Sequence, residues 1–366
     1  MLQLTNAIQF HDNALLCLHI LIQCLLVESL VSKVTRIKVV QRGRGVFVHV
    51  VTSKHNLRFQ YMHGTREDLT NQAASSMTES IYPFTEDFDV TPSVQADFDK
   101  NGYIIVRSLL DSEEVKLLKD ALESDEGIIR YAFGRDDGEG GKSRMVLWNQ
   151  PGNDITGVMA RCEKVAGTME KLLGGEVYHY HTKLMMKDAR TGGAFVWHQD
   201  YGYWYENGCI FPDMGTVFIA LDQATQENGC LKVIPGSHRV GRIDHVRVGD
   251  QVGADVERVT EIQKFLPLVH VELEPGDALF FHCNLLHRSE QNHSDRRRWA
   301  FLVAYNRASN NPVIEHHHSR YVPMAKVANS VIKTCATPID PDEKDIWDPI
   351  AKPSVSQRSL DKKRGK

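Results

Sequence analysis

Cysteine is scarce in this chain, and its spacing lacks the patterns that disulfide and zinc sites require. The 366 residues contain seven cysteines, an odd number, and no two of them form a Cys-x-x-Cys pair. The fold therefore does not rest on a disulfide framework, and no spacing indicates a zinc site. Free thiols are typical of a reducing compartment, so we predict a cytoplasmic protein.

The chain also lacks a strong net charge. It has 43 lysines and arginines against 47 aspartates and glutamates, which gives a formal net charge of -4. Nucleic-acid-binding proteins usually carry a basic patch, so we expect no nucleic-acid partner. The hydrophobic content of 42% and the charged content of 25% are ordinary for a globular protein. The length suffices for one large domain or two small ones.

The chain also lacks an apolar run long enough to span a membrane, which needs about twenty residues. The apolar run near the start of the chain is shorter. Ala14 to Val27 is apolar apart from His19 and Gln23. No lysine or arginine precedes the run and no clear cleavage site follows it. A packed helix is our expectation, with a signal peptide or a membrane anchor as the alternatives. The chain ends in Arg364-Gly365-Lys366, which is not a peroxisomal address.

The sequence pattern divides the chain into three parts. Residues 1–80 form an extension of unknown role, with a strand-like stretch from Arg36 to Val51 that a Gly-Arg-Gly turn signal interrupts. Residues 81–320 alternate apolar runs with turn signals and are predicted to form the main domain. Residues 321–366 are predicted to be a tail, frayed at the basic run Lys362-Lys363-Arg364.

Two helices of the main domain have clear signals. Asp111, followed three residues later by Glu114, is a capping signal that predicts a helix from Ser112 to Leu122. Apolar residues recur at helical spacing from Asp154 to Leu173, and Gly174-Gly175 follows them. We predict one continuous helix there, packed on a sheet.

After Gly175 the pattern changes to short strands separated by glycine and proline turns. The predicted strands are Val177 to Lys187, Ala194 to Tyr203, Thr216 to Leu221, Cys230 to Ile234, Val269 to Leu273, Ala278 to His282 and Trp299 to Tyr305. Such a series predicts a mainly β fold with flanking helices, arranged as an antiparallel sandwich or barrel. The long charged stretch from Val240 to Lys264 interrupts the series and is predicted to be either a lid or a solvated surface insertion.

The candidate site is centred on Trp197-His198-Gln199-Asp200. Side chains two positions apart on a strand point to the same face, so His198 and Asp200 can reach one metal ion. With a distant second histidine, His287, they form the set of two imidazoles and one carboxylate found in non-heme Fe(II) oxygenases. His-x-Asp alone recurs by chance, so a surface histidine and aspartate near a turn is the alternative interpretation.

Three longer runs occur in a characteristic order. They are Trp197 to Tyr205 (WHQDYGYWY), Glu227 to His238 (ENGCLKVIPGSH) and Pro275 to His287 (PGDALFFHCNLLH). Together they resemble the phytanoyl-CoA dioxygenase family of iron- and 2-oxoglutarate-dependent oxygenases, and most closely its ectoine-hydroxylase-like branch. The resemblance covers about Phe98 to Val313. It implies a double-stranded β-helix, a cupin-like jelly roll, with the metal in its mouth.

The resemblance also implies residue roles. It places the iron ligands at His198, Asp200 and His287, and it favours His287 over the nearby His282. Arg298, eleven residues after His287, is implied to hold the far carboxylate of 2-oxoglutarate, since an arginine fork can bind a carboxylate through two parallel hydrogen bonds. The weaker candidates for co-substrate contacts are Ser289, Lys183, Lys187 and Phe218.

Other histidines and aromatic residues are interpreted separately. His238, His293 and the run His316-His317-His318 are predicted to be structural or exposed. The run resembles a metal tag, but adjacent side chains on one strand cannot all converge on one metal. The aromatic residues just after Asp200 are predicted to include part of the substrate pocket, since they leave the metal directly. This set is Tyr201, Tyr203, Trp204 and Tyr205.

The activity implied by the resemblance is hydroxylation of a small organic substrate, with Fe(II), 2-oxoglutarate and O2 as cofactor and co-substrates and with release of succinate and CO2. Related halogenases carry a small residue in place of the aspartate, so Asp200 favours hydroxylation. The alternative is a non-catalytic or other-metal cupin-like binding protein of the same fold. The substrate and the oligomeric state are not predicted.

Overall fold

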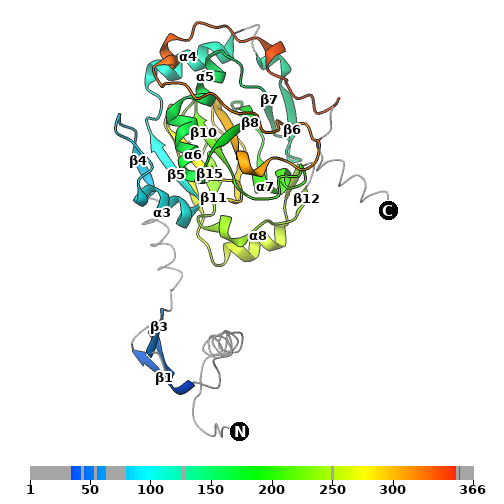
Figure 1. Ribbon diagram of the computed structural model, residues 1–366. Helices are drawn as coiled ribbons and strands as arrows, with labels where there is room; N and C mark the ends of the chain where they lie inside the picture. The colour runs from blue at the N-terminus through cyan, green and yellow to red at the C-terminus, as the bar shows by residue number, and fades with distance from the viewer. Residues whose placement is uncertain are drawn as a thin grey trace. The chain divides into compact units, whose positions relative to one another are not determined.

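The chain forms two compact units, Met1–Asp68 and Leu69–Lys366, drawn as a ribbon in Figure 1. The computed structural model describes residues 34–42, 45–52, 56–62, 80–124, 128–248, 251–351 and Ser354. The apolar run at 14–27 and the basic run at 362–364 lie outside the described residues, so the predictions for them stay predictions. Within the described part of the chain, none of the helices has the length and apolar character to cross a membrane.

The first unit contains a three-stranded antiparallel sheet. Its order is β1 (Val34–Arg42), β2 (Gly45–Thr52) and β3 (Asn56–Met62). The strand-like stretch of the sequence is confirmed as two strands paired antiparallel. The predicted domain limits at residues 80 and 320 stay predictions. The second unit also includes part of the predicted tail, where Ile346 forms a β-bridge with Trp148.

The second unit is built on two main sheets and one hairpin. The larger sheet has the order β4 (Ile81–Pro83), β5 (Tyr103–Arg107), β15 (Ala278–His282), β10 (Met214–Ala220), β17 (Arg298–Arg307), β8 (Val177–Lys187), β7 (Lys142–Trp148) and β6 (Phe133–Asp136), and only β4 and β5 pair in parallel. The smaller sheet has the order β14 (Val269–Val271), β11 (Leu231–Val233), β16 (His287–Ser289) and β9 (Phe195–His198). The hairpin is β12 (His245–Val248) with β13 (Gln251–Ala254).

Helices cover one face of the larger sheet (Figure 1). They are α3 (Pro92–Asn101), α4 (Ser112–Glu123), α5 (Ile155–Arg161), the π-helical turn η3 (Glu163–Gly167) and α6 (Thr168–Leu173). The remaining elements are α7 (Asp200–Trp204), α8 (Val256–Gln263), α9 (Val331–Thr334) and the 3-10 turns η2 (Ile128–Tyr131), η4 (Ser237–Val240), η5 (Ala308–Asn310) and η6 (Pro341–Glu343). The predicted capping box at the start of α4 is confirmed, with Asp111 and Glu114 each accepting from the other's backbone N–H.

The larger sheet is buried on both faces, which explains why its central strands read as continuous apolar runs. In β10, Val217 and Ile219 belong to the core between sheet and helices, whereas Phe218 and Ala220 belong to a second core on the opposite face. That second core also contains Val233 of β11, so it joins the two sheets. The prediction of a mainly β fold with flanking helices is confirmed.

The predicted continuous helix over 154–173 is wrong in one respect, because it is interrupted at Cys162. The backbone there is extended, with φ -71° and ψ 151°, and it separates α5 from η3. A distant segment explains the break. Val327 accepts from the N–H of Glu163 at 3.1 Å and donates to the carbonyl of Arg161 at 3.0 Å. Local periodicity cannot show such a tertiary pairing, although the apolar stripe packs in the core as predicted.

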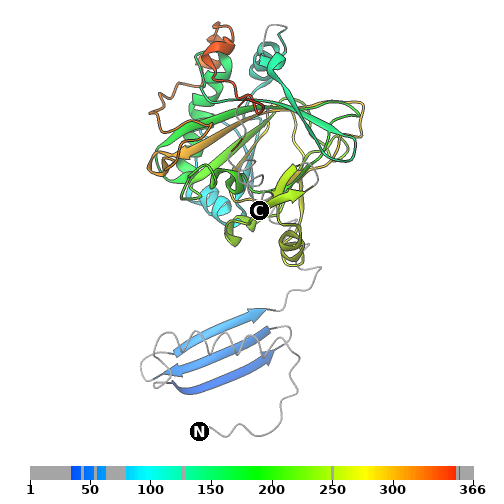
Figure 2. The same ribbon diagram turned by 90° about the vertical axis from the view of Figure 1, so that its right-hand side faces the viewer.

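The stretch from Val240 to Lys264, read from the sequence as one long loop, contains regular structure instead. It carries the β12–β13 hairpin and α8, which Figure 2 shows next to each other. The hairpin packs on β9: a Cβ added at Gly253 would lie 2.5 Å from a side-chain atom of Val196 and 2.7 Å from the carbonyl oxygen of Trp197. The hairpin therefore packs against the strand that carries His198. That the stretch acts as a lid or is a solvated surface insertion stays a prediction.

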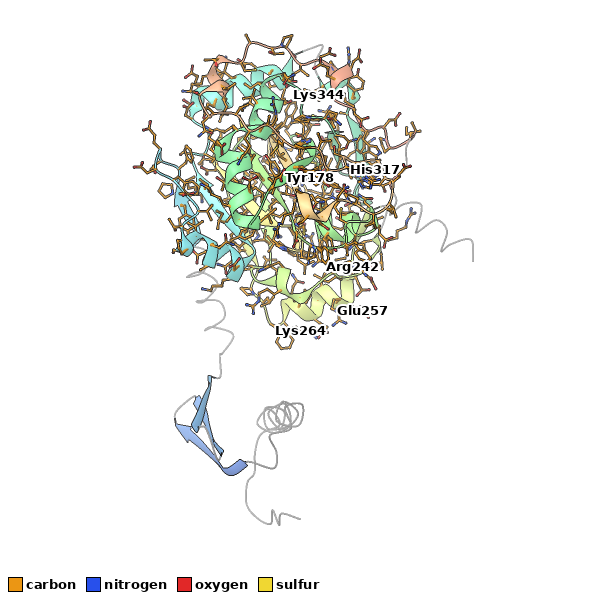
Figure 3. All side chains as sticks on the ribbon, viewed as in Figure 1. Tyr178, Arg242, Glu257, Lys264, His317 and Lys344 are labelled. Carbon is orange, nitrogen blue, oxygen red and sulfur yellow. The ribbon has the colours of Figure 1, made fainter. Side chains whose placement is uncertain are left out.

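A buried lysine joins the C-terminal segment to the start of α5. Lys344 has a fully buried side chain that forms an ion pair with Asp154, the N-cap of α5, and donates to Thr156 at 2.9 Å. Figure 3 labels Lys344 in this part of the unit. Removing one partner of a buried ion pair leaves an uncompensated charge, which typically costs about 3–5 kcal/mol.

Lys344→Met is therefore expected to lower the free energy of unfolding by about 3–5 kcal/mol in urea denaturation. Lys333→Met is the matched control, because Lys333 forms its ion pairs with Asp111 and Glu113 at the surface. We expect the control to unfold almost like the wild type. Equal stabilities of the two variants would contradict the proposed anchoring.

Candidate active site

Three side chains from separate segments converge between the sheets. One ligand atom from each of His198, Asp200 and His287 can be chosen so that all lie within 4.8 Å of one another, and no other such group of three occurs among the described residues. His198 ends β9 and lies opposite His287, the first residue of β16, with ring centroids 4.0 Å apart. The Nε2 atom of His198 lies 4.0 Å from Oδ1 of Asp200.

The segment that carries His198 and Asp200 differs in detail from the predicted strand. The strand ends at His198, and Asp200 is the first residue of α7. Gln199 between them stays extended, so the alternation of faces still directs both side chains to the same side. The buried Gln199 amide donates to the carbonyls of Gly241 and Asn284 at 2.9 and 2.8 Å, which fixes the position of this turn.

Each of the three side chains is held by a neighbour. The Nδ1 atoms of His198 and His287 lie 2.8 Å from the carbonyl of Val196 and 2.9 Å from that of Leu285. Nδ1 therefore carries the proton in each ring, and each Nε2 keeps a free lone pair. The hydroxyl of Thr216 donates to Oδ2 of Asp200 at 2.8 Å and leaves Oδ1 available.

Both imidazoles are kept neutral. Burial holds the pKa of His198 well below its usual value, and the neighbouring His287 adds to this effect. Burial also lowers the pKa of His287, against the opposing attraction of Asp200. Only neutral imidazole binds a metal ion, and two imidazoles with one carboxylate suit Fe(II). The residues present therefore fit a ferrous ion.

A small cavity lies on one side of this group. Its lining includes Arg298, Ser289, Phe218 and Lys183, together with all three residues of the group. Arg298 is 3% exposed and donates to the carbonyl of Gly229 at 3.0 Å, while its Nε has no hydrogen-bond partner. Burial lowers the pKa of Arg298 to about 10, so the guanidinium is still charged at neutral pH. No carboxylate among the described residues forms an ion pair with it, and an anionic ligand would supply the missing partner.

Lys187, also predicted to contact the co-substrate, lies outside the lining of this cavity. Its ammonium donates to the hydroxyl of Ser289 at 3.0 Å and to the carbonyl of Glu290. The Ser289 oxygen thus accepts from Lys187, which leaves its own proton free to donate. The structure places Lys187 behind Ser289 and places the other four predicted residues at the cavity.

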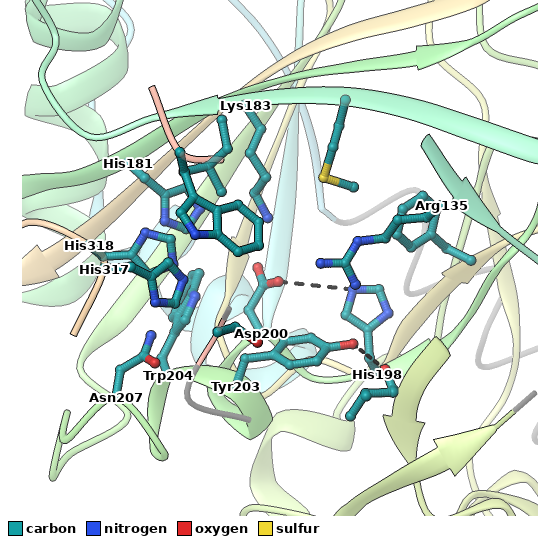
Figure 4. Close-up of a pocket in the computed structure, with 16 residues that line it drawn as sticks. Arg135, His181, Lys183, His198, Asp200, Tyr203, Trp204, Asn207, His317 and His318 are labelled. Carbon is teal, nitrogen blue, oxygen red and sulfur yellow. Dashed lines mark hydrogen bonds and ion pairs between the residues drawn. The ribbon is translucent and has the colours of Figure 1, made fainter. Parts of the chain in front are cut away.

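A larger cavity meets the small one at His198, Asp200 and Lys183, which line both. Figure 4 shows its side chains, with Arg135 near His198 on one side of Asp200 and His181, His317 and His318 on the other. Of the aromatic residues predicted to line a substrate pocket, Tyr203 and Trp204 do so, and Tyr201 and Tyr205 do not. Tyr203 donates its hydroxyl to the carbonyl of Val252 in the β12–β13 hairpin.

Sequence reasoning missed several residues of the larger cavity. His317 and His318, interpreted as structural or exposed, line it, as do Arg135 and Trp347. They come from β6 and from two segments beyond the last strand, far from the metal motif in the sequence. The run of three adjacent histidines was the available signal. Because adjacent side chains on a strand cannot all bind one metal ion, no binding role was predicted for this run.

Comparison with known proteins agrees with this geometry. The family model for phytanoyl-CoA dioxygenase matches residues 98–300, more than half of the chain. The chain belongs to the phytanoyl-CoA dioxygenase family. The matched range contains the metal-binding group and Arg298, whereas His317, His318 and Trp347 lie beyond it.

Individual relatives are similar over 44% to 68% of the chain. L-Proline trans-4-hydroxylase of Streptomyces griseoviridis is 37% identical over 176 residues, which cover 44% of this chain and 66% of that protein, just under two thirds. The ectoine dioxygenase of Sphingopyxis alaskensis is 28% identical, covering 62% of this chain and 79% of that protein. The crystal structure of EctD from S. alaskensis with bound Fe superposes with a TM-score of 0.54 at 25% identity, covering 68% and 91% of the two chains.

These similarities establish the class of this family member. It is an iron- and 2-oxoglutarate-dependent dioxygenase with the cupin-like jelly-roll fold, as the sequence predicts. The substrates named for the relatives are small molecules, which agrees with the cavities of this chain.

Proposed function

We propose that this dioxygenase hydroxylates a small carboxylic acid, with iron held by His198, Asp200 and His287. The observation that carries the proposal is that all three residues line the small cavity, while His198 and Asp200 also line the larger one. One cavity contains Arg298 and fits a co-substrate, while the other contains Arg135 and fits a substrate. A substrate in the larger cavity would therefore lie next to His198 and Asp200, with the co-substrate anchor Arg298 in the neighbouring cavity.

In the small cavity, Arg298 and Ser289 are proposed to bind the far carboxylate of 2-oxoglutarate. The guanidinium offers donors that the protein leaves unpaired, and the Ser289 hydroxyl adds one more. Phe218 lies under the guanidinium, with its ring centroid 5.7 Å from Cζ, and fixes its orientation. Lys187 is proposed to act indirectly by orienting Ser289. Lys183, which lines both cavities, is proposed to face the near end of the co-substrate.

The protein's contribution to the reaction is to bind, orient and shield. When bound, Fe(II) and 2-oxoglutarate supply oxygen activation, in which one oxygen atom of O2 goes to succinate as CO2 leaves and the other goes to a substrate C–H bond. Trp204, Tyr203 and Val252 wall the larger cavity and limit the access of water. The anchored ends of both small molecules fix which carbon faces the metal.

Arg135 supports an acidic substrate. It lines the larger cavity and has no ion-pair partner among the described residues, while the only carboxylate in that lining belongs to Asp200. An arginine side chain stays protonated in proteins, although burial lowers the pKa of Arg135. The cavity volume of ≈ 110 Å³ corresponds to roughly seven to eleven water-sized groups at about 10–15 Å³ each, the size of a small metabolite. One relative acts on L-proline, which is such an acid.

Arg135→Met is expected to raise KM for the substrate about 10- to 150-fold, the value of a hydrogen bond to a charged group, while the Kd of 2-oxoglutarate stays unchanged. Succinate release in a panel of small carboxylic acids identifies the substrate and gives KM. Arg144→Met is the matched control, because Arg144 binds Asp188 at 2.8 Å and lines neither cavity. Stimulation of succinate release by uncharged molecules alone would contradict an acidic substrate.

We also propose a cytoplasmic location. The five cysteines in the described part of the chain are free thiols, and four of them are buried. Free thiols support a reducing compartment. Fractionation of cells that express the chain tests this, and recovery in a membrane or secreted fraction would contradict it.

A further inference from the structure

A group of imidazoles occupies the part of the larger cavity away from Arg135 (Figure 4). His181 comes from β8, while His317 and His318 come from the segment after η5. The ring centroids of His181 and His318 are 4.5 Å apart, and those of His317 and His318 are 4.0 Å apart. We call these three residues the imidazole cluster. The metal-binding group does not use it.

The protonation of His318 follows from its hydrogen bond to Asn149. The side-chain amide nitrogen of Asn149 donates to the carbonyl of His317 at 2.7 Å and to Asp345 at 2.9 Å, so the amide oxygen faces His318. That oxygen lies 3.1 Å from Nδ1 of His318, which must therefore carry the proton. Burial holds the pKa of His318 well below its usual value, so the ring is neutral and its Nε2 is a hydrogen-bond acceptor.

His181 has an unmet hydrogen-bonding capacity. It is 1% exposed, it lines the cavity, and neither of its ring nitrogens has a hydrogen-bond partner among the described residues. A neutral imidazole has one donor and one acceptor, and leaving both unpaired in the interior is costly. A molecule bound in the cavity would lie next to this ring.

The surroundings of the cluster favour a nitrogen-containing group over an acid. Trp204 packs edge-on against His181 at 5.7 Å, and Trp347 lies against His317 at 4.9 Å. Both indoles line the cavity, and aromatic faces attract ammonium groups. A carboxylate at this end would instead face the lone pair of His318 Nε2. Arg135, the cation that suits a carboxylate, lies on the other side of Asp200, while Lys183 is two residues from His181 on β8.

We propose that the imidazole cluster binds the amino group of the substrate through His181 and His318, so that the substrate is an amino acid. The proposal rests on the proposed function, since it assigns the second polar end of the same substrate. The carboxylate lies at Arg135 and the amine at the cluster, so the carbon skeleton between them faces the metal. His181 and His318 thereby determine specificity for substrates that carry both groups.

The test compares amino acids with carbocyclic acids of the same shape. L-Proline and L-pipecolate are titrated against cyclopentanecarboxylate and cyclohexanecarboxylate by anaerobic calorimetry on the enzyme loaded with Fe(II) and 2-oxoglutarate. We expect the wild type to bind at least one amino acid tenfold or more tightly than its carbocyclic counterpart. His181→Phe and His318→Phe are expected to reduce that preference to less than threefold.

Two further variants separate binding from structure. His270→Phe is the matched control, because His270 lies in β14 and is absent from the lining of both cavities, and this variant should keep the full preference. His318→Gln retains an acceptor oxygen and should keep part of the preference, which also provides a folded variant if His318→Phe does not fold. A wild type without amine preference, or a preference that persists in His181→Phe and His318→Phe or is absent from His318→Gln, overturns the proposal.

The same samples report on the proposed function independently. The visible absorption of the chelate between Fe(II) and 2-oxoglutarate is recorded for each variant. Loss of the amine preference with unchanged chelate absorption supports the cluster's role in substrate binding. A wild type without chelate absorption means that the proposed function has failed, while the amine preference of the protein still decides the role of the cluster.

Discussion

His287→Ala is expected to abolish iron binding and to reduce turnover by at least about 10³-fold, since loss of a direct ligand should exceed the 10–100-fold typical of outer-shell partners. His287 is one of only two imidazoles in the metal-binding group, and it lies opposite His198 across the β9–β16 pair. Fe(II) binding by anaerobic titration and 2-oxoglutarate-dependent succinate release are the two measurements.

His282→Ala is the matched control, because it removes the imidazole that the sequence offers as the nearest alternative. His282 lies at the end of β15, where it packs against Phe98 and His238 instead of the metal-binding group. We expect this variant to bind iron like the wild type. Iron binding that survives in His287→Ala and is lost in His282→Ala would exchange the roles of the two residues.

The second large effect is expected at Arg298. Arg298→Met should raise the Kd of 2-oxoglutarate roughly 30- to 5000-fold, because truncating one partner of a buried charge pair costs about 2–5 kcal/mol. The methionine keeps much of the side-chain volume but none of the donors. Equilibrium binding of 2-oxoglutarate to the Fe(II)-loaded protein measures the effect.

The run of three arginines supplies the control within the same sequence. Arg296 is exposed and binds the side chain of Gln223 at 2.7 Å, so Arg296→Met should leave the Kd unchanged. Arg297 pairs with Glu123 and Asp222 on the helix side. If Arg296→Met weakened 2-oxoglutarate binding as strongly as Arg298→Met, the proposal that Arg298 binds the far carboxylate of 2-oxoglutarate would be contradicted.

Much of the fold follows from local pattern. β8 and β15 have the predicted bounds, because their apolar runs are bounded by turn signals and lie in a sheet buried on both faces. The capping box of α4 is a local hydrogen-bond pattern and could be predicted in the same way. The break at Cys162 could not be predicted, because it depends on Val327, 165 positions away.

The candidate site also contains residues that a sequence pattern marks and residues that only tertiary contacts bring to it. His198, Asp200, His287 and Arg298 could be predicted because a motif and a family resemblance mark them. Arg135, His317 and His318 could not, because only the packing of β6 and of the C-terminal segment beside the cavity brings them to it. Lys187 has the expected position on β8, but its hydrogen bond to Ser289 places it behind the cavity wall. Whether a side chain lines a cavity or lies behind a residue that lines it depends on tertiary packing, which a sequence pattern does not show.

Several of the residues with the fewest local signals lie beyond the range that the family model matches. The range matched by the family model ends at residue 300, and His317, His318 and Trp347 follow it. The family range thus provides the metal-binding group and the co-substrate anchor, while the segment beyond it completes the larger cavity. We therefore expect substrate choice to change with this segment and co-substrate binding to be independent of it.

The central claim is that His198, Asp200 and His287 hold iron at the junction of the two cavities. Anaerobic titration of the protein with Fe(II) and 2-oxoglutarate tests it most directly, through the weak visible charge-transfer absorption of the chelate. We predict that this absorption appears in the wild type only when both components are present and is absent in Asp200→Ala. A wild type with neither the absorption nor metal-dependent binding of 2-oxoglutarate would contradict the claim and favour a non-catalytic or other-metal protein of the same fold.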